Sequence, residues 1–152
     1  MATKSGGSGA KRKLGHVMVV EDDAFIAVAL EGALLDAGAK SVRICSSTDE
    51  ALAALREHKP DGLVLDVHLA DRADGWAIAE LVNSVGPKPP RIVFATGSPQ
   101  DIPADIAELG PVLEKPYAHQ ELIDALGRPP REGLLKRIRN ALGGDPESPT
   151  AA

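Results

Sequence analysis

The sequence predicts an α/β fold, a doubly wound parallel sheet of five strands in the order 2-1-3-4-5. Two observations support this prediction. Five short apolar runs alternate along the chain with segments of helical periodicity, which is the order of successive βα units. The runs are continuous rather than alternately apolar and polar, as is typical of parallel strands that helices cover on both faces.

The strands are expected at the apolar runs, in chain order Val17–Val20, Val42–Cys45, Leu63–Leu65, Ile92–Ala95 and Val112–Leu113. Aromatic residues make up only 3% of the chain, so aliphatic side chains must build the core around these strands. Cys45 is the only cysteine of the sequence, which excludes an intrachain disulfide. We interpret it as a buried, unreactive thiol of the second strand.

The first helix is expected in AFIAVALEGALLDAG, where Gly38 gives a stop signal. Apolar side chains recur in this segment near helical spacing, at Ala27, Leu30, Leu34 and Leu35. The second helix is expected in SSTDEALAALREHKP. It begins with a capping box of Ser47 and Glu50, and Pro60 closes it.

The third helix is expected over Gly75–Val85 and the fifth over Ala118–Leu126. The fourth helix is predicted to be short. Pro99 and Pro103 interrupt the segment after the fourth strand and leave about two turns near Pro103–Leu109, because proline cannot occupy a helix interior without removing a hydrogen bond.

Composition divides the chain into a folded body and flanking segments. Residues 14–127 form the predicted domain, between an N-terminal tail (1–13) and a C-terminal tail (143–152) that are both expected to be disordered. Residues 128–142 predict an extra C-terminal amphipathic helix with one apolar side, formed by Leu134, Leu135, Ile138 and Leu142. This helix could pack on the domain as a cap, form a partner or dimer surface, or contact nucleic acid, although the segment is too short for a helix-turn-helix module.

The distribution of charge argues against a nucleic-acid-binding protein. Residues 14–127 hold 8 Lys+Arg against 19 Asp+Glu, a net charge of −11, whereas residues 1–13 and 128–142 each carry +4. An acidic body with basic flanks is not the usual footprint for nucleic acid. The apolar stretch after the basic tail ends at Glu21 and is too short for a signal sequence, and no other stretch approaches a membrane span. We therefore expect a cytoplasmic protein without membrane contact.

Polar residues follow the strands of the predicted sheet at the points where four of them end. Glu21–Asp23 follow the first strand, Asp66 the third, Thr96 the fourth and Lys115 the fifth. The carboxyl ends of parallel strands meet in one crevice where the strand order reverses, so these side chains should converge. Partly buried carboxylates repel one another, which indicates either a bound cation among the acids or a solvated turn before a helix.

The converging residues have a coherent chemistry. Asp22, with Glu21 behind it and Asp66 beside it, supplies the hard oxygen ligands that Mg²⁺ prefers. Asp66 can then attack phosphorus and become an aspartyl phosphate. Thr96 can hydrogen-bond one phosphoryl oxygen, and Lys115 can neutralise another.

The motifs that carry these residues resemble the receiver domain of bacterial two-component response regulators over about residues 15–127. They are VVEDD, VLDVHL, FATG and EKPY, in this order at the ends of four separate strands. The resemblance implies the flavodoxin-like receiver fold and an Mg²⁺-dependent transfer of a phosphoryl group from a kinase phosphohistidine to Asp66. It also implies that the backbone carbonyl of His68 binds the Mg²⁺ and that the Lys115–Pro116 peptide bond is cis.

By this resemblance the chain acts as a stand-alone response regulator in a phosphorelay. Its Phe-Ala-Thr-Gly motif is similar to that of a subset of stand-alone receivers in bacterial stress signalling. The expected partners are a sensor histidine kinase or a phosphotransfer protein and an unknown downstream protein, with the chain itself a monomer or weak dimer. It is not expected to be an enzyme beyond slow self-dephosphorylation. Val112 stands where many receivers have an aromatic residue that changes rotamer on activation.

Two other functions could use the same residues. A phosphatase or phosphomutase with an Asp nucleophile usually has a second acid two residues later, whereas here His68 follows Asp66 at that distance. A pseudo-receiver would bind partners without phosphorylation, and the intact Asp66, Thr96 and Lys115 argue against it.

Overall fold

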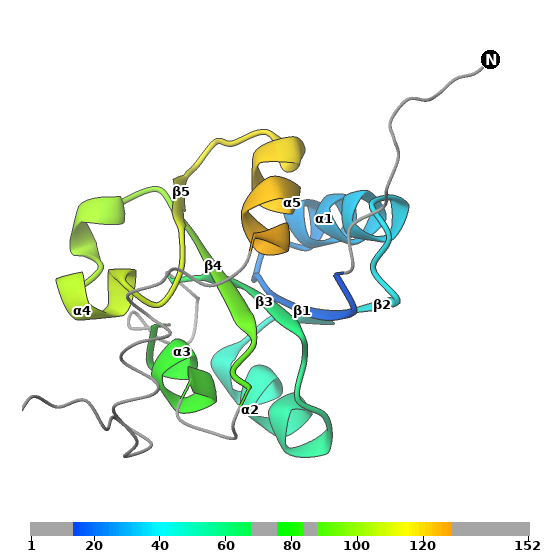
Figure 1. Cartoon of the computed structure of the whole chain (residues 1–152), viewed down its shortest axis with the longest axis horizontal. Helices are drawn as coiled ribbons and strands as arrows, with labels where there is room; N and C mark the ends of the chain where they lie inside the picture. The colour runs from blue at the N-terminus through cyan, green and yellow to red at the C-terminus, as the bar shows by residue number, and fades with distance from the viewer. Residues whose placement is uncertain (1–13, 68–75, 84–87, 129–152) are drawn as a thin grey trace, which may run out of the picture.

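A computed structural model of the chain describes residues 14–67, 76–83 and 88–128. Its five strands form one parallel sheet in the order β2-β1-β3-β4-β5, which confirms the predicted fold class (Figure 1). The strands are β1 (His16–Val20), β2 (Ser41–Cys45), β3 (Gly62–Asp66), β4 (Arg91–Thr96) and β5 (Val112–Glu114). Each begins or ends within one residue of its apolar run, because those runs are the parts of the chain that can be buried on both faces.

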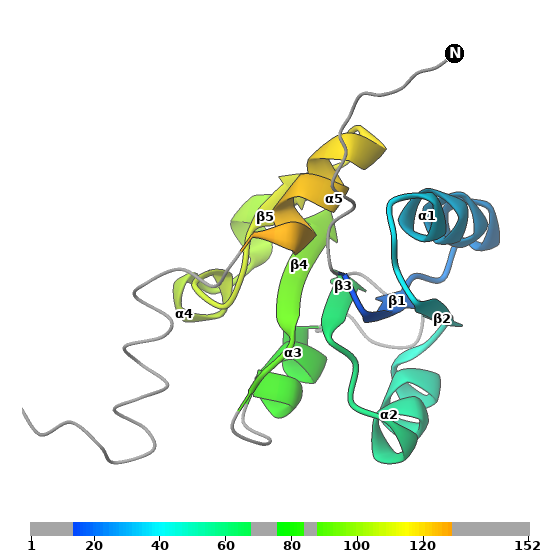
Figure 2. The same cartoon turned by 45° about the vertical axis from the view of Figure 1, so that its right-hand side comes forward.

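Helices cover both faces of the sheet, as a doubly wound fold requires. They are α1 (Ala24–Asp36), α2 (Thr48–Glu57), α3 (Trp76–Asn83), the 3₁₀ turn η2 (Pro99–Asp101), α4 (Ala104–Ala107) and α5 (His119–Gly127). The helices α1 and α5 pack in one apolar layer, and α2, α3 and α4 pack in the other (Figure 2). The strand β3 lies between the two layers and is buried along its whole length.

The start of α1 explains one of the three adjacent acids. Asp23 is the N-cap of the helix, and its Oδ1 accepts hydrogen bonds from the backbone N–H groups of Phe25 and Ile26, at 2.9 Å and 3.2 Å. This is the capping role that Asp commonly fills. Of the four apolar residues near helical spacing, Ala27, Leu30 and Leu34 are buried, whereas Leu35 is 44% exposed.

The capping box predicted for α2 is half formed. Ser47 Oγ accepts a hydrogen bond from the backbone N–H of Glu50 over 3.1 Å, as predicted. The carboxylate of Glu50 does not return the bond to Ser47. It accepts from the backbone N–H and the hydroxyl of Ser46, at 2.7 Å and 2.8 Å, because Ser46 presents two donors to the same oxygen.

The fourth helix is shorter than predicted. It spans only Ala104–Ala107, and the unpredicted turn Pro99–Asp101 precedes it. Proline is tolerated at the first position of a helical turn, because the N–H that it lacks would have no partner there. Three apolar side chains fix the segment to the sheet and are at most 7% exposed; they are Ile102, Ile106 and Leu109.

The turn between α4 and β5 depends on a glycine. A Cβ atom at Gly110 would overlap the backbone carbonyl oxygen of Ile92 in β4. Only glycine therefore lets the chain pass this close to β4 before it enters β5. Lys115 directly follows β5, so this close approach also positions the lysine at the edge of the sheet.

The predicted C-terminal helix over residues 128–142 lies outside the described residues apart from Arg128, and so do both predicted tails. In the described part of the chain, no helix has the length and apolar character needed to span a bilayer.

Candidate functional site

The register of the sheet brings the acidic strand ends together. Val20 of β1 pairs with Leu65 of β3. Glu21 and Asp66 are the next residues along these two strands, so they lie side by side at the carboxyl edge of the sheet. The backbone N–H of Glu21 also donates to the carbonyl oxygen of Cys45 over 3.0 Å, which holds this end of β1 against β2.

The pairing of β4 with β5 places the two remaining predicted residues. Thr96 is the last residue of β4 and pairs with Glu114. The backbone N–H of Lys115 donates to the carbonyl oxygen of Thr96 over 2.8 Å. Because β3 lies beside β4, the sheet puts Thr96 and Lys115 next to the end of the strand that carries Asp66.

Three carboxylates form a compact cluster at this edge. Oxygens of Glu21, Asp22 and Asp66 all lie within 4.8 Å of one another. Glu21 and Asp66 are buried, at 3% and 5% exposure, whereas Asp22 is exposed. Two buried acids beside an exposed one make an all-oxygen donor set that opens to solvent, which fits an ion such as Mg²⁺ that retains several waters.

Lys115 lies between the two buried acids. Its Nζ is 3.0 Å from Glu21 Oε1, as a hydrogen-bonded ion pair, and 3.4 Å from Asp66 Oδ2. The lysine side chain is 25% exposed, so the pair has access to solvent. The sequence predicted a lysine directed at Asp66. The structure shows Lys115 shared between Asp66 and Glu21, with the shorter contact to Glu21.

The electrostatics of the site follow from this arrangement. Burial raises the pKa of Glu21, the charge of Asp66 raises it further, and the hydrogen bond from Lys115 offsets only part of the effect. Burial acts in the opposite direction on Lys115, but its hydrogen bond to Glu21 and the charges of both acids outweigh burial and raise the pKa of the lysine. The site therefore carries more negative charge than one lysine balances.

Thr96 is fully buried, and its hydroxyl is tied to the loop that follows it. The Oγ1 atom accepts a hydrogen bond from the backbone N–H of Ser98 over 2.9 Å. A hydroxyl also has one proton to donate, which could go to an oxyanion at Asp66. Sequence reasoning did not identify Ser98, although a hydroxyl two residues before a backbone N–H is a recognised turn pattern.

The site also includes one aromatic residue that the sequence prediction left without a role. Tyr117 is half-buried, and burial raises the pKa of its phenol, while the charge of Lys115 opposes the shift. The Lys115–Pro116 peptide bond is cis, as expected. His68, whose backbone carbonyl was expected as a Mg²⁺ ligand, lies outside the described residues.

The sequence profile of the response regulator receiver domain matches residues 17–127 of the chain, which is more than half of its length. The chain belongs to the receiver domain family. Receiver domains generally act in signalling as phosphoacceptors rather than as enzymes, and they usually bind Mg²⁺ at an acidic cluster, where this chain has Glu21, Asp22 and Asp66.

Solved structures share the receiver fold. A CheY-like receiver domain from Methylobacillus flagellatus is 25% identical at a TM-score of 0.63, covering 83% of this chain and 99% of that one. The PhyR receiver domain from Erythrobacter litoralis is 22% identical at a TM-score of 0.63, and the match covers 90% of this chain and 95% of that one.

A response regulator from Burkholderia pseudomallei, solved with a phosphorylated aspartic acid, a calcium ion and citrate, is also similar. It is 22% identical at a TM-score of 0.63, covering 91% of this chain and 77% of that one. None of the curated proteins compared with the chain matches it.

Proposed function

We propose that this receiver domain is a phosphorylation switch in the cytoplasm whose phosphoacceptor is Asp66. The observation that carries the proposal is the position of Asp66. It is a buried carboxylate at the tip of the central strand, within 4.8 Å of two further acids and 3.4 Å from the Nζ of Lys115. Glu21 shares the cluster and the lysine, but Asp66 ends the central strand, between the ends of β1 and β4, and so lies beside the strand that carries Thr96.

The phosphoryl group would come from the phosphohistidine of a sensor histidine kinase or a phosphotransfer protein. A carboxylate oxygen of Asp66 attacks phosphorus, the phosphorus–nitrogen bond breaks, and its electron pair leaves with the imidazole. Lys115 neutralises one phosphoryl oxygen, for which it must turn from Glu21 toward Asp66. Thr96 donates its hydroxyl proton to another phosphoryl oxygen.

Glu21, Asp22 and Asp66, with the backbone carbonyl of His68, would hold the Mg²⁺ that the family uses. When bound, the ion neutralises the charge that gathers on the transferred group. The cluster itself supports this assignment, because oxygens of the three carboxylates lie within 4.8 Å of one another and a cation would reduce their repulsion. The Burkholderia pseudomallei relative, with its phosphorylated aspartic acid and calcium ion, supports the same pairing of groups.

Output would pass through contacts with other proteins. The PhyR neighbours support a place in stress or phosphorelay signalling. The downstream partner is a protein that recognises the phosphorylated form.

Intact mass after incubation with acetyl phosphate and Mg²⁺ tests the proposal. We expect the full chain to gain one phosphoryl group, Asp66→Asn to gain none, and Asp36→Asn, which changes an exposed acid at the end of α1, to label like the parent. Labelling that persists in Asp66→Asn would refute the assignment. Steady release of phosphate without a stable adduct would indicate a phosphatase, and no reaction at all would indicate a pseudo-receiver.

A further inference from the structure

The sheet carries an unusual set of polar residues at the edge opposite the phosphorylation site. His16 pairs with Ser41, and Met18 pairs with Arg43, at the amino ends of β1 and β2. Paired residues of neighbouring strands point to the same face, and side chains two apart along a strand share a face. Met18 packs in the apolar layer beneath α2, so His16, Ser41 and Arg43 are on that helix-covered face as well.

A cavity lies beside these polar residues, at the end of the apolar layer beneath α2. The helix α2 presents only the small side chain of Ala54 here, and Arg43 extends outward to Glu57, with an Nη1–Oε1 distance of 2.8 Å. The result is a cavity of about 350 Å³, open to solvent, between the starts of β1 and β2 and the end of α2. That volume lies at the lower end of the range for small-molecule sites.

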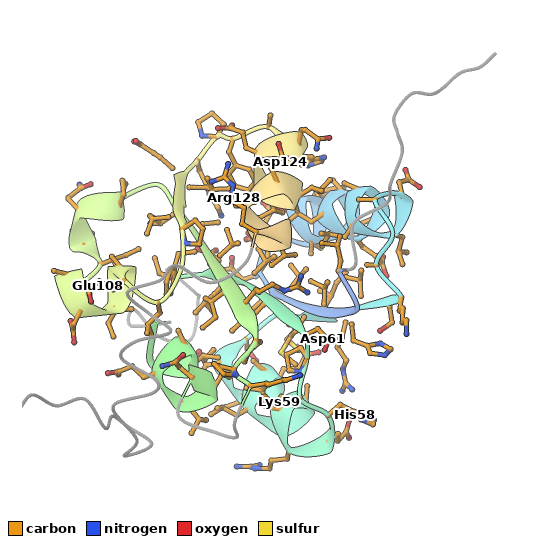
Figure 3. All side chains as sticks on the ribbon, viewed as in Figure 1. His58, Lys59, Asp61, Glu108, Asp124 and Arg128 are labelled. Carbon is orange, nitrogen blue, oxygen red and sulfur yellow. The ribbon has the colours of Figure 1, made fainter. Side chains whose placement is uncertain are left out.

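The lining combines an apolar floor with cationic groups. Val17, Met18, Ala54 and Pro60 are apolar, and every ionisable side chain of the lining is basic; these are His16, Arg43, His58 and Lys59. Figure 3 shows His58 and Lys59 beside the C-terminal end of α2, away from Glu108 and Asp124. Residues 14–127 hold 8 Lys+Arg against 19 Asp+Glu in all, so a lining with basic side chains and no acid departs from the charge of the domain.

Two acids lie near the cavity, and each has a partner. Glu57 forms the ion pair with Arg43, and the Oδ2 of Asp61 accepts a hydrogen bond from the backbone N–H of His16 over 2.8 Å. His16 Nδ1 in turn contacts Ser41 Oγ at 2.7 Å, which fixes the imidazole at the rim. The cavity thus has fixed walls, and its lining contains basic side chains and no carboxylate.

We propose that this cavity binds a small organic anion, with its apolar body on Met18, Ala54 and Pro60 and its phosphate or carboxylate group beside Lys59 and His58. The lining favours this class of ligand, because it offers basic groups to an anion and no carboxylate to a cation. The phosphorylation site lies at the other end of β1, roughly 16 Å away at about 3.3 Å per residue, so the two sites are separate.

Nuclear magnetic resonance of the full chain in metal-free buffer tests the proposal, with AMP as the phosphate probe, 2-naphthoate as the carboxylate probe and adenosine as the uncharged match of AMP. We expect saturable shifts in backbone signals of Met18, Ala54 and Lys59 with AMP, 2-naphthoate or both, and none with adenosine. Which anion binds distinguishes a phosphate from a carboxylate ligand.

Lys59→Gln should weaken binding of the active probe about tenfold, the usual cost of a lost charged contact. Lys88→Gln, which changes an exposed lysine that lines no part of this cavity, should leave it unchanged. Equal shifts with adenosine, no saturation by about 10 mM, or an equal effect of both substitutions would overturn the proposal. Shifts confined to Leu81 and Val82 would also overturn it, because these residues line a second hollow, between α2 and α3, which shares Lys59 with this cavity.

Discussion

The ammonium group of Lys115 has two carboxylate neighbours in this structure, Glu21 and Asp66. Its Nζ lies 0.4 Å nearer to Glu21 than to Asp66, at 3.0 Å against 3.4 Å. A cation among the acids would reduce the attraction of Glu21 for the lysine, because the carboxylate would share its charge with the ion. We infer that cation binding and the turn of Lys115 toward Asp66 favour each other.

The pKa of Glu21 gives a prediction about pH. A carboxyl group whose pKa is higher in the folded than in the unfolded protein holds its proton more tightly when folded, so its ionised form destabilises the fold. In metal-free buffer, the free energy of unfolding of the parent should therefore rise, relative to Glu21→Gln, as pH falls from neutral through the raised pKa of Glu21 toward its ordinary value. Urea denaturation at several pH values measures this. A difference that is constant with pH would contradict it.

Asp22 is expected to contribute to metal binding more than to stability. Asp22→Asn should lower Mg²⁺ affinity at least about tenfold, since it removes one charge from a three-carboxylate site. Without metal it should stabilise the fold by about 0.5 kcal/mol or less, because the relieved repulsion involves an exposed group. Calorimetric titration and urea denaturation check both effects. Asp23→Asn is the matched control, because asparagine also caps helices. A destabilised Asp22→Asn protein would reveal a structural role for this carboxylate.

At the scale of elements, the segment after β4 contains the shortest α-helix of the described residues, α4. The helix α4 has only four residues, and a helix this short has no stability of its own. Its position depends on three apolar contacts and on the hydrogen bond between Thr96 and Ser98. Such segments open locally at low free energy.

We predict that phosphorylation orders this segment. A phosphoryl group on Asp66 would draw the Thr96 hydroxyl toward it, and Val112 provides no aromatic ring to fill the space. The loop and α4 would then dock more firmly and present a partner surface. Hydrogen exchange with and without beryllofluoride should show slower exchange over residues 97–110 in the treated protein. Equal protection in both states would place the switch elsewhere, with the helix predicted over residues 128–142 the next candidate.

At the scale of the whole molecule, charge predicts which partners the protein avoids. The body from 14 to 127 carries 8 bases and 19 acids, and an acidic surface repels the phosphates of nucleic acid. We expect no sequence-dependent binding to duplex DNA at about 0.15 M salt. Fluorescence anisotropy with a labelled duplex measures this, with a scrambled duplex as control. Tighter binding to one sequence than to its scrambled form would show that the basic flanks read DNA.

Most residues of the site could be predicted from the sequence, because their positions depend on local and periodic patterns. Each apolar run predicts a strand that helices cover, and a parallel sheet collects the carboxyl ends of its strands at one edge. Glu21, Asp66, Thr96 and Lys115 could therefore be assigned to one crevice from their positions after four runs. Proline and glycine likewise marked the ends of helices, because each changes the backbone conformation allowed at its own position.

Tertiary structure decided what depends on residues far apart in the chain. The ion pair of Lys115 with Glu21 joins positions 94 residues apart, and no local pattern chooses Glu21 over Asp66 as the nearer partner. The tertiary structure also decided that the Glu50 carboxylate accepts hydrogen bonds from Ser46 rather than from Ser47. The basic cavity needs the register of β1 against β2, which alone sets His16 beside Ser41. Long-range pairing fixes distances and directions, and sequence periodicity fixes only which face and which end of a strand a residue occupies.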